Sequence, residues 1–210
     1  MTVPVKPKSN MNGMATLGLR AHSGRAVVVA VAGSLNQPVI VERLRIEIAE
    51  MAISGSKQPY HTAERLTLDG AEALIRQCRD SSTLLANRAI VELVGRVEAN
   101  RLTVAGAGIL FASGRPLPDL AAILRSHALI HTAEGEFFRE VLVRACELCS
   151  LAVTKIKERE AWDRGAVLFR TGSANLQERI GELGKSIGPP WRQDEKLATL
   201  AGWIALAEAK

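Results

Sequence analysis

The stretch TLGLRAHSGRAVVVAVA, residues 16–32, contains two runs of strand-forming residues, 16–21 and 26–32, that flank a short turn. The His-Ser-Gly step in that turn is typical of a tight hairpin, so the two strands are expected to be antiparallel neighbours. The second run is apolar on both of its faces, which indicates a strand covered on both sides. We therefore expect the chain to begin with a hairpin that belongs to a covered sheet.

The segments after the hairpin alternate between strand and helical patterns. The predicted elements are a strand at 38–49, a helix at 69–99, a strand at 102–112, a helical stretch at 117–150 that either breaks near Thr132 or continues through it, a strand at 151–156, and helices at 174–185 and 191–209. Residues 54–68 are expected to be irregular. Three strands in succession, followed by alternating helices and strands, predict an α/β fold with a mixed five-stranded sheet and helices on both faces.

Length and composition are those of one globular domain. The 210 residues are 47% hydrophobic and 23% charged, which is enough for a full core. We expect a mobile tail at 1–14, a core at 15–160, and a helical part at 161–210 that closes the same domain. There is no apolar segment of a signal peptide and no run of the ~20 apolar residues that cross a membrane, so a cytoplasmic protein is expected. The net charge of +5 permits an anionic partner without requiring one.

Two short stretches, together with the order of the elements, resemble a known fold. LGLRAHSG at 17–24 resembles the first hairpin of Holliday-junction resolvases, and the closing helix carries an acid, Asp194. With the strand and helix order over residues 15–207, they resemble the ribonuclease H-like fold, which resolvases, transposases and one domain of the actin-like ATPases share. IHTAEGE at 130–136 and GPPW at 188–191 also resemble stretches of a bacterial family, and that resemblance implies no activity.

The ribonuclease H-like resemblance implies a metal centre, and the sequence departs from it at two of three positions. In nucleases of this fold, carboxylates from the first strand, the fourth strand and the closing helix hold two Mg²⁺ ions that activate water. Mg²⁺ needs oxygen ligands. Here Arg20 stands at the first-strand position, residues 102–112 contain no acid, and only Asp194 matches. The sequence therefore predicts the fold without its usual metal-binding carboxylates.

The tetrapeptide HTAE occurs twice, at 61–64 and at 131–134. Threonine is a good helix N-cap, and an early glutamate suits the positive end of a helix. Both stretches are therefore interpreted as helix starts. In the later one, Thr132 is the expected cap, and Glu134 and Glu136 are the acids of the first turn.

An alternative interpretation applies if the helix continues from Leu117 through this stretch. In that case His127, His131 and Glu134 fall on one face of the helix, since they are separated by four and three residues. Such a face resembles a metal-ligand set of the His/His/Glu kind. The sequence leaves the two interpretations open.

Several polar residues lie near the ends of predicted strands, where the ligands of open α/β sheets bind. Arginine side chains among them favour an anionic ligand such as a phosphate or a nucleic-acid backbone. Unrelated surface groups are the alternative. The expected binding residues are Arg20, His22, His61, Arg115 and His131, with Glu134 and Asp194 beside them.

Two further motifs are interpreted as structural. Cys146-x-x-Cys149 lies in an apolar helical run and lacks the further ligands that zinc would need, so it predicts core packing. Gly106-x-Gly108 has Phe111 where a dinucleotide loop has its third glycine, and it lies within a strand pattern. Neither motif is expected to bind a ligand.

The function favoured by these observations is that of a non-catalytic interaction or regulatory protein, which binds a protein partner or itself and needs no cofactor. One alternative is a Mg²⁺- or Mn²⁺-dependent nuclease that acts on nucleic acid with a rearranged site made of Glu134, Glu136 and Asp194. A second alternative is an actin-like nucleotide-binding module. No membrane partner is expected.

Overall fold

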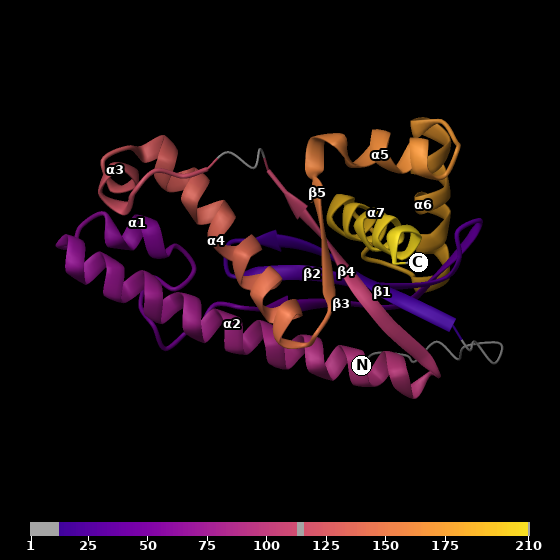
Figure 1. The fold of residues 1–210 in the computed structure, drawn as a ribbon, viewed down its shortest axis with the longest axis horizontal. Helices are drawn as coiled ribbons and strands as arrows, with labels where there is room; N and C mark the ends of the chain where they lie inside the picture. The colour runs from indigo at the N-terminus through magenta and orange to yellow at the C-terminus, as the bar shows by residue number, and fades with distance from the viewer. Residues whose placement is uncertain (1–12, 113–115, 210) are drawn as a thin grey trace.

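The computed structural model describes residues 13–112 and 116–209, and its centre is one five-stranded sheet (Figure 1). The sheet has the strand order β3-β2-β1-β4-β5. Strand β2 is antiparallel to both β1 and β3, whereas β1, β4 and β5 run parallel to one another. The mixed sheet predicted from the sequence is confirmed. The strands are β1 (Gly13–His22), β2 (Arg25–Ser34), β3 (Gln37–Glu47), β4 (Leu102–Phe111) and β5 (Ala152–Lys157).

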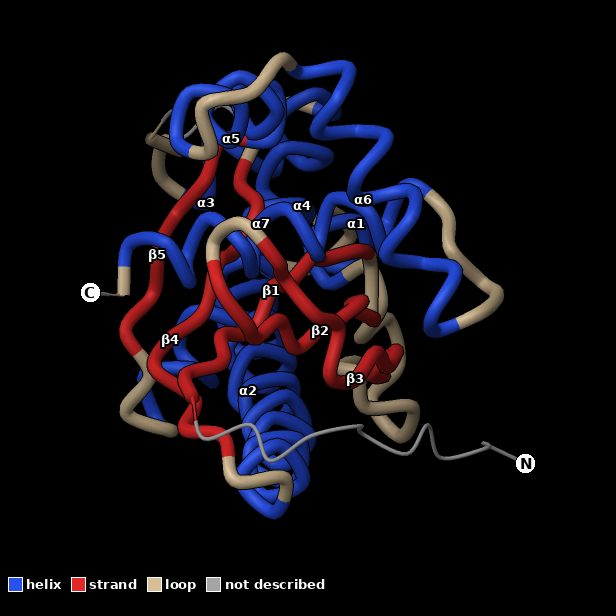
Figure 2. The backbone as a smooth tube through the Cα atoms, turned by 90° about the vertical axis from the view of Figure 1, so that its right-hand side faces the viewer, coloured by secondary structure: helices blue, strands red, loops and turns tan. Residues whose placement is uncertain are grey.

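Helices cover both faces of this sheet, and Figure 2 looks nearly along the longest of them, α2. One face carries α1 (Pro59–Ala63), α2 (Leu68–Ala99), α3 (Leu120–Leu124) and α4 (His127–Leu148), and the other carries α5 (Ala161–Leu168), α6 (Ser173–Ile187) and α7 (Gln193–Glu208). Strand β2 contributes side chains to the hydrophobic cores on both faces of the sheet. Val28 and Ala30 pack with the first group of helices, whereas Val27 and Val29 pack with the second. The apolar run at 26–32 is therefore covered on both faces, as predicted.

The structure differs from the predicted element order in its short helices. Helix α1 lies within the segment 54–68 that was expected to be irregular, and a 3-10 turn, η1 (Glu158–Glu160), and α5 follow β5 where no element is predicted. None of the three exceeds eight residues, which is too short for a hydrophobic period to be recognised in the sequence. The helical stretch at 117–150 is two helices, and the break lies at Arg125 and Ser126 instead of near Thr132.

At its N-terminal end the sheet begins three residues before the strand predicted at 16–21. Strand β1 starts at Gly13, so residues 13 and 14 of the predicted tail belong to the sheet, and residues 1–12 lie outside the described residues. The division between a core at 15–160 and a closing part at 161–210 stays a prediction. Among the described helices, none is both long enough and apolar enough to cross a membrane.

Helix α7 lies in backbone contact with the sheet because the strands present glycines to it. A Cβ atom on Gly18 would stand 1.8 Å from a carbonyl oxygen of α7, and one on Gly108 would stand 2.1 Å from another. Only glycine permits so close an approach. The hydroxyl of Thr16 donates a 2.6 Å hydrogen bond to the Gly202 carbonyl oxygen in the same contact. Helix α7 thus runs along β1, and its first turn lies over the end of that strand.

The carboxyl ends of the three parallel strands meet at one edge of the sheet. Leu19 of β1 pairs with Ile109 of β4, and Phe111 at the end of β4 pairs with Lys157 at the end of β5. The chain leaves β5 through η1 at this edge. Open α/β sheets bind their ligands beyond the carboxyl ends of the strands, so a functional site is expected here.

Candidate functional site

Arg20 on β1 binds two carboxylates that come from distant parts of the chain. Its Nη2 donates to Glu158 Oε1 at 2.7 Å and its Nε donates to Oε2 of the same carboxylate at 3.3 Å, which is a bidentate pair. Its Nη1 donates to Asp194 Oδ1. Glu158 opens η1 directly after β5, and Asp194 lies in the first turn of α7. We call Arg20, Glu158, Asp194 and the adjacent His22 the arginine cluster.

The positive charge of Arg20 is permanent in this setting. Burial by itself would lower the pKa of Arg20, but the hydrogen bonds and charges of Glu158 and Asp194 raise it above its ordinary value. The three side chains are 20%, 35% and 30% exposed, so their attraction is less screened than that of an ion pair on an open surface. The arginine cluster therefore contains a built-in cation between two anions.

His22 lies next to Asp194 at the end of β1. Its Nε2 is 3.0 Å from Asp194 Oδ2, but the contact lacks the geometry of a hydrogen bond. Burial lowers the pKa of His22; Asp194 opposes that shift, whereas Arg20 and Arg25 add to it. The imidazole is therefore neutral near pH 7.

Glu158 is the member of this cluster that sequence reasoning missed. Strand β4 supplies no acid, as predicted, and the second carboxylate comes from the end of the next strand instead. The available signal was an acid directly after the last parallel strand. It stands in the charged run KIKERE at 155–160, where a carboxylate that faces solvent would look the same in sequence.

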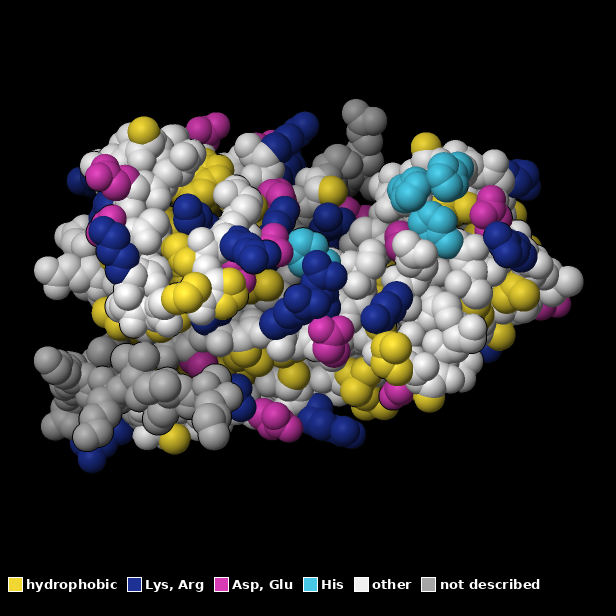
Figure 3. Space-filling model, turned by 180° about the vertical axis from the view of Figure 1, so that it is seen from behind, with side chains coloured by type: hydrophobic (Ala, Val, Ile, Leu, Met, Phe, Trp, Pro, Cys, Tyr) yellow, Lys and Arg dark blue, Asp and Glu magenta, His cyan; other side chains and the backbone are white. Residues whose placement is uncertain are grey.

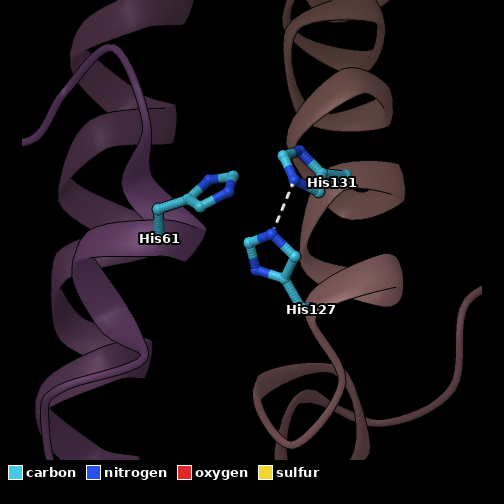
Figure 4. A group of neighbouring side chains, drawn as sticks. All are labelled: His61, His127 and His131. Atoms are coloured by element: carbon cyan, nitrogen blue, oxygen red, sulfur yellow. Dashed lines mark hydrogen bonds between the residues drawn. The ribbon is translucent and has the colours of Figure 1, made fainter.

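Three histidines from two helices form a second group, the histidine cluster. His61 lies on α1, and His127 and His131 lie one turn apart on α4. Their potential ligand atoms are all within 4.8 Å of one another, and the Nε2 atoms of His127 and His131 are 3.0 Å apart. Figure 4 shows the three rings gathered in the space between the two helices, and Figure 3 shows histidine side chains grouped at the surface. His127 and His131 are exposed, and His61 is half-buried.

Glu134 stands behind His61. It is only 4% exposed, and its Oε2 lies 2.8 Å from His61 Nδ1 and accepts the backbone N–H of the same residue at 3.2 Å. Burial raises the pKa of Glu134, and its hydrogen bonds with His61 oppose that shift. The third nitrogen beside His127 and His131 is therefore that of His61, and Glu134 orients His61 instead of joining the set as a ligand.

Neither HTAE stretch is the helix start that the sequence predicted. Helix α4 begins at His127, so Thr132 and Glu134 lie within it, and α1 ends at Ala63, within its own HTAE stretch. The hydroxyls of Thr62 and Thr132 each donate a 3.0 Å hydrogen bond to the carbonyl oxygen four residues earlier. Threonine side chains within helices commonly make this bond. The helix passes through Thr132, as in the alternative interpretation, but it begins at His127 and does not continue from Leu117.

The other predicted residues divide among separate surroundings. Glu136 pairs with Arg139 at 3.3 Å and lines a groove with Lys155 and Lys157, whereas Arg115 lies outside the described residues. The acids Glu134, Glu136 and Asp194 thus each face a different basic side chain. Of the residues expected at one rim, Arg20, His22 and Asp194 meet in the arginine cluster, and His61, His131 and Glu134 meet in the histidine cluster.

The cysteine and glycine motifs have structural surroundings. Cys146 is fully buried, and burial raises its pKa to about 12. The side chain of Asn87 donates a 3.1 Å hydrogen bond to Cys149 Sγ. Gly108 is one of the glycines against α7, so its backbone meets a helix and not a dinucleotide.

No family model and no curated protein sequence matches this chain. Its structure is similar to that of Thermus thermophilus RuvC in complex with a Holliday junction substrate, with a TM-score of 0.54 and 7% sequence identity over 93% of this chain and 94% of that one. A second structure of Thermus thermophilus RuvC gives a TM-score of 0.55 and 8% identity over 93% of this chain and 95% of that one. Identities this low establish the fold alone. With the strand order and the helices on both faces, they show that this chain has a divergent ribonuclease H-like fold of the RuvC kind.

Proposed function

We propose that this protein is a non-catalytic interaction protein that keeps the ribonuclease H-like fold without the metal chemistry of its nucleases. The observation that carries the proposal is the guanidinium of Arg20 between Glu158 and Asp194. These carboxylates lie at the sheet edge where the resemblance places magnesium ligands. Their oxygens accept N–H donors of Arg20 instead.

Charge also opposes a divalent ion at this edge. Two unit charges 4 Å apart interact by about 4 kcal/mol near a protein surface, so Mg²⁺ beside Arg20 would face a repulsion of roughly twice that. Mg²⁺ also demands octahedral oxygen ligands and gives up water reluctantly. A guanidinium is weakly hydrated and suits a bidentate carboxylate. The built-in cation therefore competes well against a metal ion for Glu158 and Asp194.

Nucleic acid is the ligand class that we propose first, bound without cleavage. RuvC holds a Holliday junction substrate in one of the complexes to which this chain is similar. A net charge of +5 is compatible with a polyanion. Lys155 and Lys157 line a groove at the same edge of the sheet together with Phe111 and the acids Glu136 and Glu140. The two ammonium groups could contact phosphates there. A protein partner or a second copy of the chain is the alternative ligand.

The test uses a fluorescently labelled four-way DNA junction and a single strand of the same sequence. We expect binding by fluorescence anisotropy that weakens as salt rises, and no cleavage in millimolar Mg²⁺ or Mn²⁺. The control is Asp194→Asn, because a nuclease at this edge would need that carboxylate. Metal-dependent cleavage by the wild type that Asp194→Asn abolishes would overturn the proposal in favour of the nuclease alternative.

Two further outcomes separate the remaining classes. If neither DNA binds, the nucleic-acid part of the proposal fails, and light scattering then asks whether the protein associates with itself. A rise in melting temperature with millimolar ATP would instead favour the actin-like alternative, since a ligand that binds only the folded chain stabilises it.

A further inference from the structure

We propose that His61, His127 and His131 bind a divalent transition-metal ion of the zinc class. Each histidine offers one imidazole nitrogen, and these atoms all lie within 4.8 Å of one another (Figure 4). His61 is far in sequence from the other two, since it lies on α1 whereas His127 and His131 lie on α4. Such a site is independent of the arginine cluster and of the function proposed above.

The spacing of the nitrogens suits a tetrahedral ion. Zinc binds imidazole nitrogen at about 2.0–2.1 Å, so two ligand nitrogens of a tetrahedral site stand ~3.3 Å apart. The Nε2 atoms of His127 and His131 are already 3.0 Å apart. Because these two side chains are exposed, small rotations of their rings could bring all three nitrogens to the ion.

Glu134 prepares His61 for this role. Its carboxyl group lies 2.8 Å from His61 Nδ1. When Nδ1 carries the proton and donates to this group, the lone pair of Nε2 is free to bind a metal ion. A carboxylate behind a metal-binding histidine fixes the tautomer and the direction of the ring and makes the imidazole a stronger ligand. The same carboxylate accepts the backbone N–H of His61, so both the ring and the backbone are held.

The burial of the Glu134 carboxyl group is the second observation that points to an ion. The residue is 4% exposed, and its Oε1 has no hydrogen-bond partner among the described residues. Burial of a carboxylate is costly unless a positive charge compensates it. A dication on His61 would supply that charge through the ring.

Packing alone does not explain the arrangement of the rings. The three imidazoles contact one another edge to face, with centroids 4.5 to 5.8 Å apart, although two of them are exposed to water. Without an ion, the Nε2 atoms of His127 and His131 can share one proton in a single hydrogen bond. With an ion, all three ring nitrogens have a partner.

The donor set also selects the ion. Imidazole nitrogens suit Zn²⁺, Co²⁺, Ni²⁺ and Cu²⁺, whereas Mg²⁺ and Ca²⁺ prefer oxygen. Three protein ligands leave one position of a tetrahedral ion for water or an outside ligand. The ion would join α1 to α4.

The experiment is a calorimetric titration of Zn²⁺ into the untagged, metal-free full chain, with Co²⁺ absorption as an independent readout of tetrahedral nitrogen ligands. We expect one ion per chain, a rise in melting temperature with Zn²⁺, and no response to Mg²⁺. His127→Ala and His131→Ala should each weaken binding by more than tenfold. His22→Ala is the matched control, because it removes the one histidine outside the cluster and should leave the affinity unchanged.

The decisive variants are His61→Gln and Glu134→Gln. Two exposed histidines one turn apart on a helix can bind zinc by themselves, but that binding would not depend on α1. We expect His61→Gln to weaken binding by more than tenfold, and Glu134→Gln by ten- to a hundredfold. Circular dichroism of each metal-free variant verifies that it is folded. Wild-type affinity in folded His61→Gln, equal binding of Mg²⁺, or absence of a one-to-one Zn²⁺ complex would each overturn the proposal.

Discussion

The arginine cluster and the histidine cluster both pair carboxylates with nitrogen side chains, but they place the carboxylate differently. In the arginine cluster, Glu158 and Asp194 both face Arg20, whose charge is permanent. In the histidine cluster, Glu134 stands behind His61, and the rings of the three histidines face one another. Carboxylates that are already paired with an arginine are not available to bind a metal ion. A carboxylate that is hydrogen-bonded to the far nitrogen of an imidazole instead orients the ring to bind one.

The strongest way to break the arginine cluster is to move α7 away from β1. In Gly18→Ala, the new Cβ would stand 1.8 Å from a backbone oxygen of α7, so the helix must shift. We expect a loss of at least about 3 kcal/mol of stability, since overpacking against backbone has no cheap relief. Thermal unfolding measures it as a fall in melting temperature on the order of 6–12 °C.

A matched glycine controls for the general cost of an added methyl group. Gly95 lies in α2, and a Cβ there would meet no atom within 4 Å. Gly95→Ala should therefore be neutral, or stabilising by up to about 1 kcal/mol, because alanine is the better helix former. Equal melting temperatures for Gly18→Ala and the wild type would show that the contact between α7 and the sheet is looser than the structure has it.

A sharper test exchanges the built-in cation for an acid. Arg20→Asp would leave three carboxylates at the edge of the sheet, with Glu158 and Asp194 no longer paired. Without metal, we expect a loss of about 1–3 kcal/mol of stability. This is less than for a fully buried ion pair, because these side chains are partly exposed. We also expect Mg²⁺ or Mn²⁺ to raise the melting temperature of this variant, while the wild type shows no such response.

The neutral variant Arg20→Gln separates the two effects of this exchange. It removes the same positive charge without adding an acid, so it should lose stability but gain no response to Mg²⁺. If Arg20→Asp and Arg20→Gln behave alike in Mg²⁺, the guanidinium is not what keeps a metal ion from this edge.

The fold could be predicted from sequence because its signals are local and long. The run at 26–32 is apolar on both faces because β2 contributes side chains to two hydrophobic cores. The 32 residues of α2 are long enough to repeat the apolar period of a helix many times. Helix α1 has five residues, too few for any period to appear. Because the prediction lacked α1, it did not show that this helix places His61 beside α4.

The two clusters could be predicted only in part, because long-range contacts build them. Arg20 and Asp194 were expected near one another from the resemblance, but Glu158 reaches Arg20 across 138 residues of sequence separation. The pair His127 and His131 is visible in sequence as a helical spacing of four. No local pattern connects His61 to α4. His61 was expected near His131 only as one of several residues at a common rim of the sheet, whereas the short helix α1 is what brings it there.

The mildest test of the comparison is the pH dependence of stability that His22 contributes. Burial and the charges of Arg20 and Arg25 lower the pKa of His22 in the folded chain, against the attraction of Asp194. The unfolded chain therefore binds the proton more readily than the folded chain. The contribution of His22 to stability is fully present above the ordinary histidine pKa of about 6.5, and it is lost as the pH falls from that value toward the folded pKa. In His22→Gln this loss should be smaller, which urea unfolding between about pH 7.5 and about pH 5.5 measures. An unchanged slope in His22→Gln would mean that the imidazole is as well hydrated in the folded chain as in the unfolded one, and that the arginine cluster is more open to water than its contacts indicate.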